Sequence, residues 1–329
     1  MGNKTGSVIL LILFLCVSCA RQGAIPNPDK FPPHLLSVSS PNRNELHLRF
    51  DEVIDPVKVL KETYQILSPK DTAEIRFITA STDNSKILVF YTSPLLPSEY
   101  RLIGLATDNS NNASSINSRF TASERKDSIP PSINAFPKDT LTVFPYRVTL
   151  EANEPLDTSD GFKVIHLPTV SNISYYWRQN LKKLDINFKD SSLIKHPLYI
   201  LIPQGIADFA GNKTRNGLAF FEYADSALEL NRVFGRVESS SPSKGPILLL
   251  FKDHDSLFAA TLTDSSGRFS TAIEKKTSVT IEAWADIDGD GFFEENGQLI
   301  YAGETDALNI ITNIPVPPRS LEQLIQEKP

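Results

Sequence analysis

The sequence predicts an all-β protein made of antiparallel sandwiches arranged in tandem. Short runs of β-branched or alternating apolar residues recur along the chain, and turn-forming runs such as "DNS", "SSG" and "DGDG" separate them at sandwich-like spacing. Apolar residues at helical spacing are scarce. The runs that we expect to form strands are Glu45–Phe50, Ser85–Tyr91, Tyr146–Ala152, Leu181–Phe188, Pro197–Ile202, Pro246–Phe251 and Ser278–Trp284.

Residues 1–18 are expected to be a signal peptide. An apolar run of about ten residues, Val8–Val17, follows a short polar segment that carries one cation, Lys4. This run is too short for a spanning helix, which needs roughly 20 apolar residues, and it suits the core of a secretory signal. The chain is therefore expected to be exported. Both of its cysteines, Cys16 and Cys19, lie at the end of this run.

Cys19 is the expected lipidation site. The segment "LCVSC" places Val17 and Ser18 before Cys19 and resembles the lipobox of bacterial lipoproteins. The resemblance implies that Cys19 becomes the first mature residue and that its sulfur carries a diacylglycerol. It departs from the usual pattern at Cys16, where leucine is common. The alternative is an ordinary signal peptide cut nearby, which leaves an exposed thiol on an exported protein.

Residues 19–32 are expected to be a lipidated cysteine and a linker. One acyl chain binds a membrane only marginally, whereas two or three hold a protein durably on a bilayer. The proline-rich segment after Cys19, at about 3 Å per residue over roughly 13 residues, would span on the order of 40 Å. A disordered leader without a spacing role fits these residues equally well. Because Ala20 and Arg21 follow the cysteine in place of aspartate, the resemblance implies the outer membrane of a bacterial envelope.

The charge of the chain argues against nucleic acid as a partner. Removal of residues 1–18 takes away one lysine and no acidic residue, so the formal charge changes from −6 to −7. No cluster of lysine and arginine stands out in the sequence. The expected mature chain also holds a single cysteine, so it forms no internal disulfide and its stability must come from packing.

Residues 33–124 and 130–224 are expected to form two related sandwiches. A pair of prolines opens each one, at Pro32 and at Pro130, which gives an internal period of 98 residues. Both also close alike, since the strands in "YRLIGLATDNSNN" and "YILIPQGIADFAGN" run into Asp108 and Asp208.

Acidic residues recur at matching positions of the two units. A strand leads to Glu52 in the first unit and to Glu154 in the second. One interpretation is that each glutamate holds a cation together with the closing aspartate, Asp108 or Asp208, at one end of the sandwich. Tight-turn chemistry explains the same aspartates without any ligand, and the sequence favours that structural interpretation.

These turn motifs resemble those of the bacterial immunoglobulin-like domains found in S-layer and other envelope proteins. The segments "NEPLD" and "ADFAGN" match the usual pattern, and "TDNSNN" is a version that lacks the glycine. The resemblance covers roughly residues 32–223. It implies immunoglobulin-like sandwiches that act as structural or binding modules.

Residues 231–315 are expected to form a third sandwich, and residues 316–329 a tail. The third sandwich resembles the transthyretin-like or carboxypeptidase-regulatory-like modules of secreted proteins, which implies a non-catalytic companion domain. The tail is expected to be a short helical turn or a frayed end without a role. The residues that carry the resemblance are Gly235, Val237, Thr263, Asp264, Gly267 and Phe269.

The segment "ADIDGDGFFEENG" predicts a calcium loop in the third sandwich. Asp286, Asp288 and Asp290 alternate ahead of Gly291, a spacing that lets a tightly turned loop aim three carboxylates at one cation. Ca²⁺ prefers six to eight oxygen ligands at about 2.3 to 2.6 Å, and the backbone carbonyl of Phe292 is expected to add one. The alternative is a solvated acidic hairpin turn.

The second half of this loop departs from the EF-hand pattern. Its twelfth position is Gly297, where the EF-hand has a bidentate glutamate, and a strand pattern precedes the loop. Glu294 or Glu295 is expected to supply the missing carboxylate. The ion would stiffen the loop, since no candidate nucleophile or base stands beside it.

Catalytic motifs are not evident, and we expect a protein that is not an enzyme. The five histidines form neither an HxH nor an HExxH spacing, and neither a G-x-S-x-G elbow nor a phosphate loop is present. The segment "SYYW" places Tyr175 and Trp177 on one side of an expected strand, where they would form a ligand surface or contribute a core tryptophan.

Together these features predict a non-catalytic binding or structural module of a bacterial cell envelope. Its expected partners are the lipid bilayer, through Cys19, and an envelope protein or glycan. The alternative is a carbohydrate-binding protein, or one that acts on polysaccharide or peptide with catalytic acids in the sandwich loops.

Overall fold

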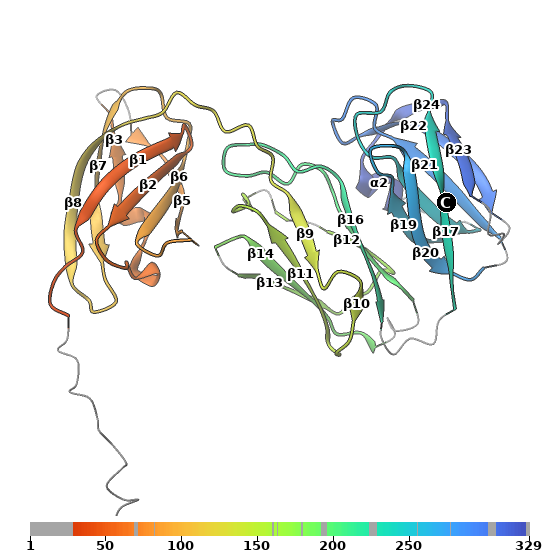
Figure 1. The fold of residues 1–329 in the computed structure, drawn as a ribbon, viewed down its shortest axis with the longest axis horizontal. Helices are drawn as coiled ribbons and strands as arrows, with labels where there is room; N and C mark the ends of the chain where they lie inside the picture. The colour runs from red at the N-terminus through yellow and green to blue at the C-terminus, as the bar shows by residue number, and fades with distance from the viewer. Residues whose placement is uncertain are drawn as a thin grey trace, which may run out of the picture. The chain divides into compact units, whose positions relative to one another are not determined.

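A computed structural model shows that the chain is almost entirely β and forms three sandwiches in sequence order (Figure 1). It describes residues 29–326, apart from 69–71, 82, 160, 163, 179, 192–195, 224–228, 255, 277 and 302–306. Cys19 and residues 1–28 of the expected leader and linker lie outside the described residues. Within the described part of the chain, helices are too short to cross a bilayer.

The first sandwich consists of two four-stranded sheets. One has the order β1-β2-β6-β5 and the other the order β4-β3-β7-β8. Two 3-10 turns, η1 (Pro56–Lys58) and η2 (Lys61–Thr63), follow β2. The strands are β1 (Leu35–Asn42), β2 (Glu45–Phe50), β3 (Gln65–Leu67), β4 (Thr72–Ala73), β5 (Ile75–Ala80), β6 (Ile87–Thr92), β7 (Glu99–Thr107) and β8 (Ala113–Thr121).

The second sandwich repeats this plan with sheets β13-β14-β11-β9 and β10-β16-β15-β12. Strand β10 pairs with β16 in parallel, and the other pairs in these two sheets for which a register is known are antiparallel. The strands are β9 (Ile133–Phe136), β10 (Thr140–Leu141), β11 (Tyr146–Ala152), β12 (Ile165–Leu167), β13 (Ile173–Arg178), β14 (Lys183–Phe188), β15 (Leu198–Ile202) and β16 (Gly217–Tyr223).

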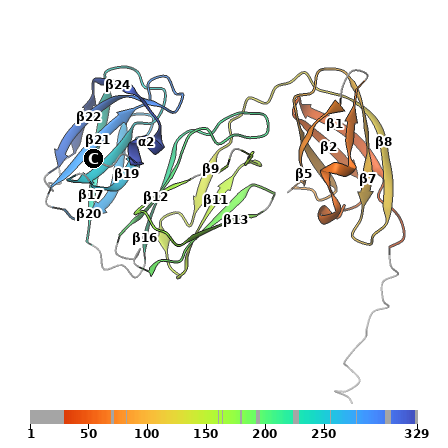
Figure 2. The ribbon, with the colours of Figure 1, turned by 180° about the vertical axis from the view of Figure 1, so that it is seen from behind.

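The third sandwich has a three-stranded sheet, β20-β17-β23, and a five-stranded sheet, β19-β18-β21-β22-β24. A short helix, α2 (Leu321–Gln326), lies at its side in both views (Figures 1 and 2). The strands are β17 (Leu230–Ser239), β18 (Leu248–Asp253), β19 (Ser256–Leu262), β20 (Arg268–Glu274), β21 (Val279–Ala285), β22 (Phe293–Tyr301), β23 (Leu308–Thr312) and β24 (Ile314–Arg319).

The all-β prediction is confirmed, and each of the seven expected strands is present. Two of them, Glu45–Phe50 and Tyr146–Ala152, have the expected bounds. The expectation of a tail from residue 316 needs correction, because β24 pairs with β22 and α2 packs Leu321 and Leu324 into the core of the third sandwich. Residues up to 326 therefore belong to this sandwich.

The matching turns that close the first two sandwiches have the same hydrogen bonds. The carboxylate of Asp108 accepts the backbone N–H groups of Ser110 and Asn112, each at 2.8 Å. The carboxylate of Asp208 accepts those of Ala210 and Asn212, at 2.8 and 2.9 Å. An aspartate that binds its own backbone in this way fixes a tight turn.

The first of these turns does without glycine because asparagine replaces it. Gly211 has a φ of 91° in the second turn, and Asn111 at the equivalent place in the first has a φ of 70°. Asparagine tolerates this left-handed conformation better than most residues. The departure from the domain pattern at "TDNSNN" therefore leaves the turn geometry unchanged.

Strand β15 is buried on both faces. Leu198, Ile200 and Ile202 belong to the core of the second sandwich, whereas Tyr199 and Leu201 belong to the core of the third. The hydroxyl of Tyr199 also donates a hydrogen bond to the carbonyl of Ala272 at 2.7 Å. Successive side chains on a strand point to opposite faces, so one strand serves two cores. This explains why β15 is a continuous apolar run instead of an alternating one.

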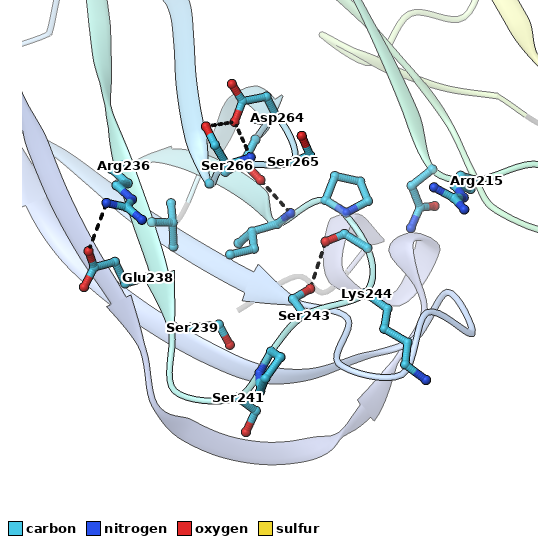
Figure 3. Close-up of a pocket in the computed structure, with 18 residues that line it drawn as sticks. Arg215, Arg236, Glu238, Ser239, Ser241, Ser243, Lys244, Asp264, Ser265 and Ser266 are labelled. Carbon is cyan, nitrogen blue, oxygen red and sulfur yellow. Dashed lines mark hydrogen bonds and ion pairs between the residues drawn. The ribbon is translucent and has the colours of Figure 1, made fainter.

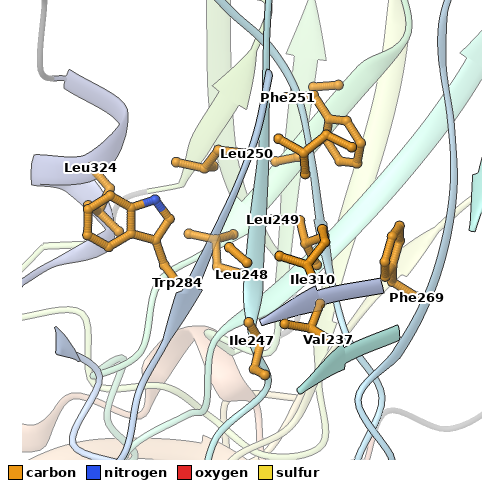
Figure 4. Packing of buried hydrophobic residues seen from close by; sticks show 14 of the residues in the cluster. Val237, Ile247, Leu248, Leu249, Leu250, Phe251, Phe269, Trp284, Ile310 and Leu324 are labelled. Carbon is orange, nitrogen blue, oxygen red and sulfur yellow. The ribbon is translucent and has the colours of Figure 1, made fainter. Parts of the chain in front are cut away.

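Strand β23 closes the third sandwich at a place where two glycines allow close approach. It pairs in parallel with β17, where Gly235 lies opposite Leu308. A Cβ atom on Gly235 would lie 2.2 Å from the carbonyl oxygen of Leu308, and one on Gly297 of β22 would lie 2.0 Å from that of Ile311. Figure 4 shows the packed interior, where Ile310 of β23 lies beside Val237 and Trp284 lies beside Leu324 of α2.

Candidate functional site

The acidic loop connects two central strands of the third sandwich. It runs from Asp286, directly after β21, to the first residue of β22, and these two strands pair up to Ala285 and Glu295. Gly289 and Gly291 have φ values of 81° and 96°, which L side chains rarely adopt. The glycines thus let the loop turn sharply enough to gather its carboxylates.

Three carboxylates of this loop and that of Glu294, the second residue of β22, converge. Ligand oxygens of Asp286, Asp288, Asp290 and Glu294 all lie within 4.8 Å of one another. Asp286 is buried, and its two oxygens accept the backbone N–H groups of Gly289 and Gly291 at 2.7 and 3.0 Å. The structure therefore brings together the three aspartates of the sequence prediction.

Glu294, and not Glu295, completes this group. Glu294 accepts the backbone N–H of Ile287 at 2.8 Å. Glu295 is buried elsewhere, and its carboxylate accepts hydroxyl hydrogen bonds at 2.9 to 3.1 Å from Ser239, Ser240 and Ser241. Glu295 is thus tied to the end of β17 and the residues that follow it.

Phe292 contributes its backbone to the same loop. Its N–H group donates to the carboxylate of Asp290 at 2.9 Å, and its side chain is exposed. The expected use of its carbonyl oxygen as a cation ligand stays a prediction.

The electrostatics of the loop oppose four ionised carboxylates. Burial raises the pKa of Asp286, its hydrogen bonds from Gly289 and Gly291 lower that pKa, and the charges of Asp290 and Asp288 raise it further. Burial likewise raises the pKa of Glu294. A bound cation would offset this repulsion, because opposite charge favours the ionised form of each acid.

Two further carboxylate groups lie at matching places in the first two sandwiches. Asp29, Glu52 and Asp108 form one group, and Asp127, Glu154 and Asp208 form the other, each with ligand oxygens within 4.8 Å. The carboxylates of the glutamate and the closing aspartate of each unit therefore lie close together, as one of the two sequence interpretations requires.

The sequence analysis did not identify Asp29 and Asp127 as part of these two carboxylate groups. Each lies three residues before the paired prolines that open its sandwich. The two aspartates are 98 residues apart, as the prolines are, so the internal repeat could have identified them. The recurrence shows that the acids belong to the shared plan of the two domains.

Glu154 is expected to make stability depend on pH. Burial, followed by the charges of Asp208 and Asp127, raises its pKa from 4.5 to about 7. In the folded protein it takes up a proton as pH falls through about 7, whereas in the unfolded chain it stays ionised until about pH 4.5. The free energy of unfolding should therefore rise as pH is lowered from 8 to 5.

Replacement of Glu154 by glutamine should remove this dependence. Glu154→Gln is expected to stabilise the protein at pH 8 by about 2 kcal/mol, allowing for solvent screening, and to flatten the profile between pH 5 and 8. Chemical denaturation at several pH values with chelator present measures this. Glu151→Gln is the control, since Glu151 forms an ion pair with Lys183 at 3.0 Å. Equal profiles for wild type and Glu154→Gln would contradict the prediction.

The aromatic pair on β13 has one exposed ring. Tyr175 is exposed, whereas Trp177 is partly buried and packs edge-on against Phe162, with ring centroids 5.1 Å apart. Tyr176, on the opposite face of the strand, is also exposed. Trp177 thus contributes to the core of the second sandwich, the simpler of the two roles that the sequence suggested.

A polar hollow of about 780 Å³ lies beside the acidic loop (Figure 3). Arg236 and Glu238 lie on one side of it, and Arg215 and Lys244 lie on the other. Hydroxyl groups line the space between them, from Ser239, Ser241, Ser243, Ser265 and Ser266. The sequence showed these serines only as a polar run, because the groove forms when distant segments meet.

Among the comparisons with known proteins, only the search of solved structures finds matches. No protein-family model matches it. No curated protein is similar to it either. Two matching structures are the N-terminal part of the bacterial S-layer protein SbsC (TM-score 0.27, 14% identity, 58% of this chain and 44% of that one) and domains 1–6 of surface layer protein SbsC (0.28, 12%, 83% and 41%).

A third match is the Bacteroides ovatus protein SGBP-B, solved in complex with a mixed-linkage heptasaccharide (TM-score 0.19, 10% identity, 70% of this chain and 64% of that one). The chain thus spans less than half the length of the two S-layer structures. At these identities and TM-scores, the likenesses say nothing of what this chain binds or does.

Proposed function

We propose that this protein is a lipid-tethered, non-catalytic binding or structural module of a bacterial cell envelope, with a calcium ion that stiffens its third sandwich. The observation that carries the proposal is the arrangement of the chain. A ten-residue apolar segment ends two residues before Cys19, a proline-rich segment follows that cysteine, and the described chain forms sandwiches. Diacylglycerol on Cys19 and an outer-membrane location complete the proposal.

The tether is tested by membrane partition. The full chain, expressed in a bacterial host that lipidates proteins, is expected in the membrane pellet and to be released by detergent but not by high salt. Two or three acyl chains bury many CH₂ groups, each worth about 0.8 kcal/mol, so salt should not reverse the attachment. Cys19→Ala has two expected results. The protein is either cleaved and absent from the pellet, or it remains as a precursor that still contains the leader.

Cys16→Ala is the matched control. It removes the other cysteine, three residues away, and is expected to leave partition and processing unchanged. A Cys19→Ala protein that is processed and retained as the wild type is would show that the sulfur of Cys19 carries no anchor.

Calcium fits the residues of the acidic loop. Asp286, Asp288, Asp290 and Glu294 offer hard oxygen ligands from one short segment, and the burial of Asp286 favours a counter-charge. When bound, the ion would supply positive charge that holds the hairpin between β21 and β22. A role in ligand exchange or catalysis is not part of the proposal.

A further inference from the structure

Three arginines, Arg232, Arg236 and Arg268, lie on one sheet of the third sandwich. The polar hollow shares Arg236 and Asp264 with a second hollow of about 630 Å³. The second hollow is lined by Phe234, Arg268 and Ser270 together with Asn309 of β23. Because the two hollows meet at shared residues, they form one extended depression, which we call the arginine trough.

Strand alternation places Arg236 of the trough on the outer face of sheet β20-β17-β23. Val233 and Val237 of β17 point into the core, so Arg232, Phe234 and Arg236 point outward. The side chain of Phe234 is 45% exposed. Each of the three outward residues is exposed, and so the side chains are open to a ligand.

Two arginines of the trough, Arg236 and Arg268, lie directly opposite each other on neighbouring strands. Arg236 on β17 is the register partner of Arg268 on β20, and Phe234 is the partner of Ser270. Like charges directly opposite each other across a strand pair destabilise a sheet. The ion pair between Arg236 and Glu238 has a distance of 3.6 Å and is well exposed, so it offsets little of this repulsion.

The rest of the trough adds further cations and hydroxyl groups. Arg215 and Lys244 extend the positive charge along the polar hollow. The acidic residues of the lining are Glu238 and Asp264, and the carboxylate of Asp264 is engaged by the N–H groups of Ser266 and Arg268. The lining of the trough thus carries four cations against two carboxylates, and the acidic loop lies next to its Lys244 end.

We propose that the arginine trough binds a linear acidic polysaccharide, in which carboxylates recur along the sugar chain. The planar guanidinium group matches a carboxylate in a bidentate way, and two arginines side by side suit recurring charges. The exposed ring of Phe234 offers an apolar face for a sugar ring. The hydroxyls of Ser239, Ser241 and Ser266 donate to carboxylates of the protein, so each is left to accept a hydrogen bond from a hydroxyl of a sugar.

This inference deepens the proposed role as a binding module by naming its ligand class, and it depends on neither the tether nor the calcium ion. The full chain in detergent is tested by affinity electrophoresis and calorimetry with polygalacturonate and alginate, and with dextran as the neutral polymer. Binding to at least one acidic polymer is expected, with weakening at high salt, and dextran should not bind measurably.

Variants of the trough separate a binding role from a structural one. Arg236→Gln with Arg268→Gln should weaken binding at least tenfold and leave the melting temperature equal or higher, because the repulsion is relieved. Phe234→Ala should weaken binding several-fold. The control is Arg101→Gln with Arg119→Gln, which makes the same charge change on exposed arginines of the first sandwich and should leave affinity within twofold.

Several results would overturn the proposal. These are binding to neither acidic polymer, an equal loss in the control pair, or equal binding of polyglutamate that depends on the same arginines, which would identify an acidic protein as partner. Failure of membrane partition with intact polysaccharide binding would remove the tether alone. Intact membrane partition without polysaccharide binding would refute the arginine trough as a binding site and leave the tether.

Discussion

Gly235→Ala is expected to destabilise the third sandwich by about 3 kcal/mol, the largest effect that we predict for a single methyl group. The added Cβ would lie 2.2 Å from the carbonyl oxygen of Leu308 and 2.9 Å from its backbone nitrogen. Backbone atoms of a paired strand have no rotamer that relieves such a contact, so β23 must move away from β17. Thermal unfolding should show a fall of about 6–12 °C.

Gly217→Ala is the matched control for this substitution. Gly217 also lies in a strand, β16, but a Cβ there would lie 3.6 Å from the nearest side-chain atom, in Ile202. This is ordinary van der Waals contact, so the melting temperature should stay within about 2 °C. Equal behaviour of the two variants would show that β23 does not approach β17 as closely as described.

Asp286→Ala is expected to have the second large effect, through the hydrogen bonds of the loop and through the proposed calcium site. The substitution removes the acceptor of two backbone hydrogen bonds, to Gly289 and Gly291, at a buried position. Hydrogen bonds to a charged group contribute about 1.5–3 kcal/mol each, and relief of the repulsion among the carboxylates offsets part of their loss, so a net loss of about 2 kcal/mol is expected in chelator. Differential scanning calorimetry of the full chain measures it.

Calcium should stabilise the wild type and not this variant. At a free Ca²⁺ concentration 100-fold above the dissociation constant, linkage adds about 2.7 kcal/mol, or about 5–10 °C in melting temperature. Asp264→Ala is the control, because Asp264 also accepts two backbone N–H groups in this sandwich but belongs to none of the three carboxylate groups that the described residues form. It should lower the melting temperature and keep the response to calcium.

An unchanged midpoint of the wild type at millimolar free Ca²⁺ would contradict a structural ion. A calcium response that survives in Asp286→Ala would place the ion elsewhere. The carboxylate groups that contain Glu52 and Glu154 would then be the next places to test.

The strands were predictable from the sequence because side-chain alternation and turn residues are local. Strand β11 shows this, since its buried and partly exposed residues alternate as the sequence pattern requires. Strand β24 was missed because it contains three prolines, which usually argue against a strand. It lies at the edge of its sheet, next to β22, where a missing N–H group costs little.

The three aspartates of the candidate site were predictable from the sequence, whereas the identity of its glutamate was not. The alternation of Asp286, Asp288 and Asp290 is a local pattern, whereas the choice between Glu294 and Glu295 depends on which face of β22 each one occupies. Successive residues point to opposite faces, so one reaches the loop and the other reaches the serines. The hairpin register that decides between them is a property of the folded sheet.

Tertiary packing also creates the arginine trough, and it brings Asp29 and Asp127 into the carboxylate groups of the first two sandwiches. Arg236 and Arg268 lie 32 positions apart in sequence and become neighbours only through the register of β17 with β20. The sequence therefore showed no cationic cluster, although the folded surface has one.

The central claim is the lipid on Cys19, and mass spectrometry of the N-terminal peptide of the protein purified from native membranes tests it most directly. The account predicts a peptide that begins at Cys19 and carries a diacylglycerol mass on its sulfur. A peptide with a free Cys19 thiol, or one that still contains the leader, would contradict it.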